Sequence, residues 1–172
     1  FGNELLPYEI CRVKFSETLS HEQKIASEKI CALVRKKTYN TTLLLGVTGS
    51  GKTEVYLDAV SQALEMGKQV LVLVPEIALS IDFVQRVIHR YKTKPGEWHS
   101  GVQKKERFRL YNAVAQNQIQ LVIGARSALF LPFADLGLII VDEEHDGSYK
   151  QEEGVCYNAR DMAVWRASLL RI

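Results

Sequence analysis

Apolar residues recur along this chain with two periods that alternate. Short, nearly continuous apolar runs, typical of strands buried on both faces, occur at residues 41–45, 69–74, 121–123 and 136–141. Helical spacing occurs in a segment that starts at Leu19 and at residues 52–65, 77–91, 102–116 and 158–170. This alternation predicts parallel βαβ units, and therefore an α/β fold with a doubly wound, mostly parallel sheet covered by helices on both faces.

Local signals mark several boundaries. Ser20, followed by Gln23 three residues later, has the spacing of a capping box at the start of the first helix. Gly67 stands where a helix that ends near residue 65 needs its C′ residue. Residues 1–16 show no steady period and are predicted to form an N-terminal arm or linker, which leaves one folded domain over residues 17–172.

The composition narrows the class of protein without choosing a function. The chain has 172 residues, of which 47% are hydrophobic and 24% charged, as in an ordinary globular domain. A net charge of +2 neither indicates nor excludes nucleic acid, because a local basic patch would be averaged away. No apolar run approaches the roughly 20 residues of a membrane span. Cys11, Cys31 and Cys156 are widely spaced, which predicts reduced thiols and no zinc site.

A glycine-rich turn after residues 41–45 carries the first chemical motif. Residues 46–53, GVTGSGKT, fit G-x-x-x-x-G-K-[ST] completely. The glycines let backbone N–H groups point at phosphate oxygens, and the following helix adds the positive end of its dipole. Lys52 is predicted to reach the β and γ phosphates, and the Thr53 hydroxyl to bind Mg²⁺. The predicted nucleotide-binding residues of this loop are Gly46, Thr48, Gly49, Ser50, Gly51, Lys52 and Thr53.

The carboxyl end of the run at 136–141 carries the second motif, which begins with Asp142 and Glu143. Parallel strands end at one edge of a sheet, so this pair is expected beside the phosphate loop. Asp142 is predicted to hold Mg²⁺, and Glu143 to orient or deprotonate the attacking water; with Lys52 they are the predicted catalytic residues. His145 either couples this site to its neighbours or is an ordinary loop residue. The two motifs indicate a P-loop nucleoside triphosphatase, and leave open a nucleotide kinase, a GTPase, a transporter ATPase and a helicase.

Six segments taken together narrow that choice. They are GVTGSGKTEVY (46–56), LVPEIAL (73–79), HSG (99–101), GARSALF (124–130), LGLIIVDEEH (136–145) and SYKQ (148–151). In this order, over residues 17–172, the chain resembles the primosomal protein N′ (PriA) replication-restart DNA helicases of superfamily two. The resemblance implies a three-layer RecA-like P-loop NTPase domain, the first lobe of an ATP-dependent 3′-to-5′ DNA helicase that acts in replication restart and primosome assembly.

The resemblance also implies roles for individual residues. Gln23 would pair with the adenine edge, as in the family's upstream glutamine motif. The residues expected to bind DNA, through backbone contacts or an aromatic loop, are Pro75, Glu76, Arg126, Ser127, Tyr149 and Lys150. Tyr157 belongs either to that aromatic loop or to the core. Two positions depart from the family pattern: Ala125, where Thr is usual, and Asn158, where His is usual.

Ligands and partners follow from the same resemblance. It implies ATP and Mg²⁺, single-stranded and forked DNA, primosome proteins and single-strand-binding protein, in the bacterial cytoplasm with the nucleoid and without a membrane. Zinc is expected in the complete family enzyme, in a cysteine-rich module absent from this sequence. The second motor lobe and its arginine finger are also absent, so this chain alone is expected not to unwind DNA. Two alternatives stay open: another superfamily two DNA or RNA translocase, and a nucleotide-binding remnant without turnover.

Overall fold

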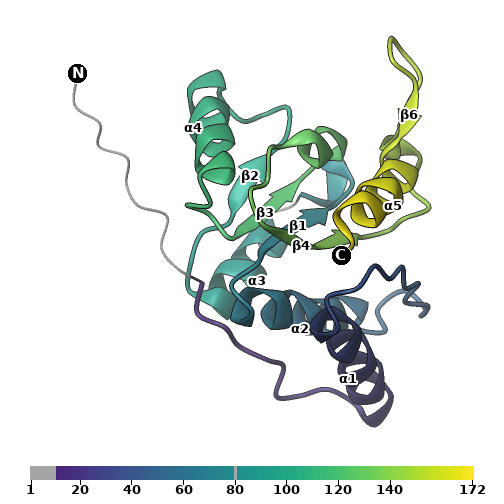
Figure 1. Cartoon of the computed structure of the whole chain (residues 1–172). Helices are drawn as coiled ribbons and strands as arrows, with labels where there is room; N and C mark the ends of the chain where they lie inside the picture. Colours follow the sequence, from purple (N-terminus) through teal and green to yellow (C-terminus); the bar gives the residue numbers. More distant parts are fainter. Residues whose placement is uncertain (1–10, 80) are drawn as a thin grey trace.

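A four-stranded parallel sheet forms the centre of the computed structural model, which describes residues 11–79 and 81–172 (Figure 1). Its strands are β1 (Gln69–Leu73), β2 (Gly96–Trp98), β3 (Leu121–Gly124) and β4 (Leu136–Val141). The strand order is β2-β3-β1-β4, and every neighbouring pair is parallel. The predicted α/β fold with a parallel sheet is therefore confirmed.

Helices cover both faces of this sheet (Figure 1). Val70 and Val72 of β1 pack with α2 and α3, whereas Leu71 and Leu73 pack with α4 and α5, because successive side chains of a strand point to opposite faces. The helices are α1 (His21–Arg35), α2 (Lys52–Glu65), α3 (Ile81–Tyr91), α4 (Lys104–Ala115) and α5 (Ala159–Leu170). The result is the predicted arrangement of three layers, with α1 packed on the outside of α2.

Shorter elements complete the description. Three 3₁₀ segments lie at Glu76–Ala78, Arg126–Phe130 and Gly147–Tyr149, and an antiparallel pair is formed by β5 (Lys150–Gln151) and β6 (Tyr157–Asn158). The helix predicted at 77–91 is thus divided into a 3₁₀ turn and α3. The predicted capping box is present, since Ser20 N donates to Gln23 Oε1 over 2.7 Å and Gln23 N donates to Ser20 Oγ over 3.3 Å. None of the described helices is both long and apolar enough to cross a membrane.

Residues 41–45 form no strand, which corrects the prediction made from their apolar run. Leu43 is 63% exposed and Leu45 is 81% exposed. A strand needs a neighbour for its backbone N–H and C=O groups as well as apolar side chains, and no described strand pairs with this run. Conversely, β2 was not predicted, because it is only three residues long and begins inside a Pro–Gly turn signal.

Residues 11–16 of the predicted arm lie along α2 and α3, and residues 1–10 of it are outside the described part of the chain. Arg12 N donates to Tyr91 O over 2.9 Å. Ser16 N donates to Asp58 Oδ1 over 2.8 Å. This part of the arm is therefore attached to the domain by specific hydrogen bonds.

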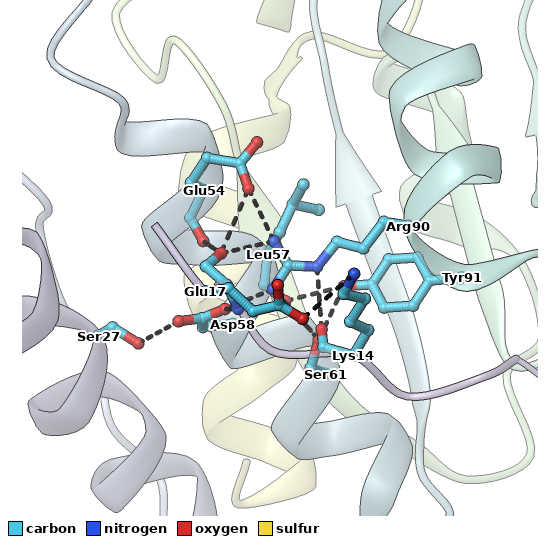
Figure 2. A network of polar contacts seen from close by, with 10 residues as sticks. Lys14, Glu17, Ser27, Glu54, Leu57, Asp58, Ser61, Arg90 and Tyr91 are labelled. Atoms are coloured by element: carbon cyan, nitrogen blue, oxygen red, sulfur yellow. Dashed lines mark hydrogen bonds and ion pairs between the residues drawn. The ribbon is translucent and has the colours of Figure 1, made fainter. Parts of the chain in front are cut away.

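A buried polar network connects the arm, α1, α2 and α3 (Figure 2). Arg90, whose side chain is 8% exposed, forms ion pairs with Asp58 and, over 2.9 Å, with Glu54. Its Nε donates to Lys14 O over 3.0 Å, and Asp58 Oδ2 accepts from Ser27 Oγ over 2.6 Å. Burial raises the pKa of Asp58, but hydrogen bonds from Ser27, from the arm and from Arg90 outweigh it, and the net pKa is lowered. The ionised carboxylate is therefore the stable form in the fold.

Candidate functional site

The glycine-rich motif forms a tight turn directly before α2. Gly49 and Gly51 have φ angles of 78° and 79°, in the left-handed region that favours glycine, and Gly51 is the N-cap of α2. Space is restricted as well. A Cβ on Gly46 would lie 2.6 Å from Ser50 Oγ, and a Cβ on Gly51 would lie 2.4 Å from Gln23 Nε2. The backbone conformation of this loop therefore depends on glycine at these positions.

Lys52 folds its side chain back over this loop. Its Nζ donates to the carbonyl oxygens of Gly46, over 2.8 Å, and Val47, over 3.2 Å. Both acceptors are neutral, so an anionic phosphate would be a stronger partner for the ammonium group. The first N–H groups of α2 have no partner within the helix and lie at the same end as Lys52 and Thr53. A triphosphate fits this combination of a cation and a helix N-terminus.

Asp142 directly follows β4 and contacts α2. Its backbone N–H donates to Leu73 O over 2.9 Å, which extends the sheet by one residue. Asp142 Oδ2 accepts from the Tyr56 hydroxyl, and Oδ1 accepts from Glu143 N, each over 3.0 Å. Burial raises the pKa of this carboxyl, and the hydrogen bonds together with Lys52 only partly offset it, so the net pKa is raised. A cation bound at Asp142 would compensate this cost of burial.

Glu143 occupies a strained position in the turn after β4. Its φ angle is 46°, a left-handed value that is uncommon for a residue other than glycine. Its backbone carbonyl accepts from Asp146 N over 2.8 Å, and its Oε2 lies 3.5 Å from His145 Nε2. Strain of this kind persists only where the surroundings hold it, and it is common at functional sites. The side chain is exposed, so solvent reaches the carboxylate.

The residues that could hold Mg²⁺ are Thr53 and Asp142, as the sequence predicted. Tyr56 lies between them, since its hydroxyl bonds to Asp142 and Thr53 also lowers its pKa by a hydrogen bond. Magnesium binds through one or two protein ligands together with phosphate oxygens and water, so this small set fits it. Within residues 11–79 and 81–172, no three His, Cys, Asp or Glu side chains are grouped as a metal site.

Gln23 contacts the phosphate loop. Its Nε2 donates to Ser50 O over 2.7 Å, while its Oε1 accepts the capping-box bond from Ser20 N. The side-chain amide therefore joins the start of α1 to the loop. Pairing of Gln23 with an adenine base stays a prediction.

Glu76 and Ser127, both expected to bind DNA, have partners within the protein. The Glu76 carboxylate accepts hydrogen bonds from Ser100 Oγ and, over 3.0 Å, from Ser100 N, and these bonds lower its pKa. An anion at this place would repel a phosphate, so any contact of Glu76 with DNA, which stays a prediction, would have to be made by its backbone. Ser127 Oγ accepts from Trp98 Nε1 over 3.1 Å. Pro75, beside Glu76, is buried.

Arg126 connects the end of β3 to the β5–β6 pair. Its Nη1 donates to Lys150 O over 2.6 Å and to Ser148 O over 3.3 Å. Its guanidinium lies over the Tyr157 ring, 5.8 Å from the centroid. Arg126 thus contacts the backbone of Lys150, whose ammonium group forms an ion pair with Glu152 over 2.7 Å, and contact of either side chain with DNA stays a prediction.

Tyr149 is a buried core residue, which corrects its predicted role in base stacking. It is 1% exposed, and its hydroxyl donates to Asp142 O over 2.6 Å. A ring without exposed surface cannot stack on a base. The exposed aromatic residue of this region is Phe130, which is 54% exposed and packs edge-on against Tyr157 with centroids 5.1 Å apart.

Sequence reasoning assigned no role to Tyr56, Trp98 or Ser100, although Tyr56 and Ser100 lie in two of the six segments that carry the resemblance. Tyr56 had a signal, because a residue three positions after Thr53 lies on the same side of a helix. The contacts of Trp98 and Ser100 join segments that are far apart in the sequence, so no local pattern indicates them.

Comparison with known proteins identifies the family. The chain matches the DEAD/DEAH box helicase family over residues 22–167. It is 46% identical to replication restart protein PriA of Rickettsia felis over 150 residues, which are 87% of this chain and 22% of that protein. It is 42% identical to PriA of Bacillus subtilis over 163 residues (94% and 20%), and 42% identical to PriA of Helicobacter pylori over 160 residues (92% and 26%).

The chain spans 22%, 20% and 26% of the length of these three relatives, so its similarity is to one segment of each. The family match covers most of the chain and includes both the phosphate loop and the acidic turn. The hydrogen bond from Tyr56 of α2 to Asp142, which follows β4, brings the acidic turn to the helix that begins at the phosphate loop. The chain belongs to the DEAD/DEAH box helicase family.

Proposed function

We propose that this chain is the ATP-binding lobe of an ATP-dependent DNA helicase of the PriA type, which acts in replication restart and primosome assembly. The observation that carries the proposal is the grouping of Lys52, Thr53 and Asp142 at the start of α2. The finer parts rest on similarity to PriA: 3′-to-5′ movement, work on forked DNA, and partnership with primosome proteins and single-strand-binding protein. Such a protein would act with the nucleoid in the bacterial cytoplasm.

Each residue of the ATP site has a task in this proposal. Lys52 and the N–H groups of the loop bind and orient the β and γ phosphates. Thr53 and Asp142 hold Mg²⁺, which neutralises phosphate charge when bound. Glu143 orients the attacking water and accepts its proton. Tyr56 keeps Asp142 in one orientation through its 3.0 Å hydrogen bond.

The DNA track in this proposal runs along the ends of β1 and β3. Arg126 and Lys150 bind phosphates as cations, and Pro75, Glu76 and Ser127 contribute through the backbone. Fast turnover also needs an arginine finger, worth about 10³ to 10⁵ in rate and supplied by a second lobe in the family. The chain on its own is therefore proposed to hydrolyse ATP slowly and not to unwind DNA.

The test measures ATP binding and turnover with single-stranded DNA, forked DNA and RNA, in the longest encoded protein that contains this chain. Lys52→Ala should abolish tight ATP binding, and Glu143→Gln should bind ATP while turnover falls about 10²- to 10⁴-fold. Lys36→Ala, an exposed lysine outside the site, is the matched control. Stimulation by RNA alone would indicate another translocase. Wild-type binding without turnover would indicate a remnant.

A further inference from the structure

One side of α1 faces α2 with a row of mostly polar residues. The row consists of Gln23, Ser27, Cys31 and Arg35, which follow one another at intervals of four and therefore lie on one face of the helix. Ser27 and Cys31 are the buried residues of α1, and its apolar residue Val34 is partly buried against the core. By contrast, every residue of α2 from Val55 to Leu64 is buried. Polar contacts therefore take part, together with apolar packing, in attaching α1 to α2.

Three hydrogen bonds run along this contact. Gln23 Nε2 donates to Ser50 O of the phosphate loop over 2.7 Å, at the start of α1. In the middle, Ser27 Oγ donates to Asp58 Oδ2 over 2.6 Å. At the far end, Arg35 Nη1 donates to Gln62 Oε1 over 2.5 Å. Arg35 lies about 18 Å along the helix axis from Gln23, too far to touch a nucleotide held by the loop.

The middle bond, from Ser27 to Asp58, ends on a carboxylate that other residues also hold in place. Figure 2 shows Ser27 approaching Asp58 from one side while Arg90 holds the same carboxylate from the other. The other oxygen of Asp58 also accepts from Ser16 N over 2.8 Å. This carboxylate belongs to α2 and also bonds to α3 and the arm. Through it, Ser27 fixes the position of α1 relative to these three parts of the domain.

An open pocket lies beside the contact between α1 and α2. The pocket has a volume of about 550 Å³ and is lined by Ser27, Cys31 and Arg35 from α1 and by Asp58 and Gln62 from α2. Where side chains do not interdigitate, directional hydrogen bonds decide how two helices lie against one another.

We infer that Ser27 and Arg35 are positioning residues for the nucleotide site: they set the register of α1 along α2 and thereby place Gln23 on the phosphate loop. The inference rests on the proposed function, in which that loop binds ATP. A hydrogen bond weakens steeply outside its narrow range of length and angle, so a shift of α1 by about 1 Å would break the contact between Gln23 and Ser50. The loop would then lose one of the bonds that fix its path.

The test is a double-mutant cycle on the affinity for Mg-ATP, measured by titration calorimetry in the longest encoded protein at about 0.15 M salt, where the distant charge of Arg35 is screened. Ser27→Ala with Arg35→Ala should weaken ATP binding about threefold to tenfold. When Gln23→Ala is already present, the Ser27 and Arg35 substitutions should cause no further loss of ATP affinity, because the contact between Gln23 and Ser50 is already gone. Gln69→Leu is the matched control: this buried side chain bonds to Val114 O, Ile119 O and Asp135 N but not to α1, so the change should lower the melting temperature and leave ATP affinity unchanged.

Three results would overturn the inference while ATP binding persists. The first is an unchanged affinity in the Ser27 and Arg35 double variant. The second is an equal loss with and without Gln23→Ala, and the third is a Gln23→Ala variant that binds ATP as tightly as the wild type. A wild-type protein that binds no ATP would contradict the proposed function itself, and the inference with it.

Discussion

The hydroxyl of Tyr56 donates a hydrogen bond of 3.0 Å to Asp142 Oδ2 and so joins the first turns of α2 to the acidic turn after β4. Burial, together with the negative charge of Asp142, raises the pKa of Tyr56, so the phenol stays protonated and remains a donor. Glu143 N occupies the other oxygen of Asp142. The carboxylate is therefore oriented from two sides before any ion is bound.

Tyr56→Phe is expected to impair use of magnesium while it keeps the buried ring. Loss of an orienting partner of a metal ligand typically costs at least tenfold in metal affinity, so the Mg²⁺ concentration for half-maximal ATPase should rise about tenfold. Tyr91→Phe is the matched control, because Tyr91 is also buried and its hydroxyl bonds to Leu57 O, away from the site. An identical Mg²⁺ dependence in wild type and Tyr56→Phe would contradict this role.

Asp142→Asn is expected to leave the protein without magnesium at least as stable as the wild type. The folded pKa of Asp142 is raised above its ordinary value of 3.8, so the fold binds this proton more tightly than the unfolded chain does. Such a carboxyl contributes stability as the pH falls through the raised pKa and costs stability above it. At pH 7 the variant should melt at the wild-type temperature or a few degrees above it. It should also lose the stabilisation that Mg-ATP gives the wild type, and a clearly lower melting temperature without Mg²⁺ would contradict the raised pKa.

Arg126→Ala is expected to weaken DNA binding in a salt-dependent way. Removal of one phosphate contact should reduce the slope of log affinity against log salt concentration by about one unit. Fluorescence anisotropy with labelled forked DNA between 50 and 200 mM salt, both approximate limits, measures this slope. Lys29→Ala, an exposed lysine on α1, should leave the slope unchanged. A slope in Arg126→Ala equal to that of the wild type would remove Arg126 from the DNA track.

The three cysteines are expected to react with iodoacetamide at different rates. Burial raises the pKa of Cys11 to about 11 and also raises that of Cys31, so both remain thiols at pH 8. Cys156 is exposed. Mass spectrometry should find Cys156 modified first, and the other two only after addition of denaturant. Equal rates for all three in the native protein would contradict the burial of Cys11 and Cys31.

The sequence indicated the elements and motifs whose signals are local. The helix Lys52–Glu65 begins at a phosphate-loop motif and ends beside a glycine, and both its bounds agree with the prediction. The capping box at Ser20 and the strand Leu136–Val141 were found for the same reason. Asp142 lies beside the helix that begins with Lys52 and Thr53, as expected, although the contact is made through Tyr56 and not through a strand before the phosphate loop. The roles of these three residues stay predictions.

Features that depend on strand pairing or on burial could not be predicted from local sequence signals. The run at 41–45 has the composition of a strand, yet a partner decides whether a strand forms. Tyr149 stands in a polar segment beside the acidic turn, where its burial could not be foreseen. The ion pair of Arg90 with Asp58 joins two helices through residues that no motif contains.

The position of β4 at the end of the sheet has a consequence for handling the protein. One side of this strand has no neighbour among the described residues, and its sequence LGLIIV contains no charge or proline of the kind that usually blocks pairing between molecules. Leu45, just before the phosphate loop, and Val47, within it, are 81% and 79% exposed. A preparation of this chain is therefore expected to aggregate through strand addition at β4 as its concentration rises. A further strand paired with β4 would suppress this aggregation. Light scattering at increasing protein concentration therefore tests whether the edge is covered: scattering should rise if it is open and stay constant if it is paired.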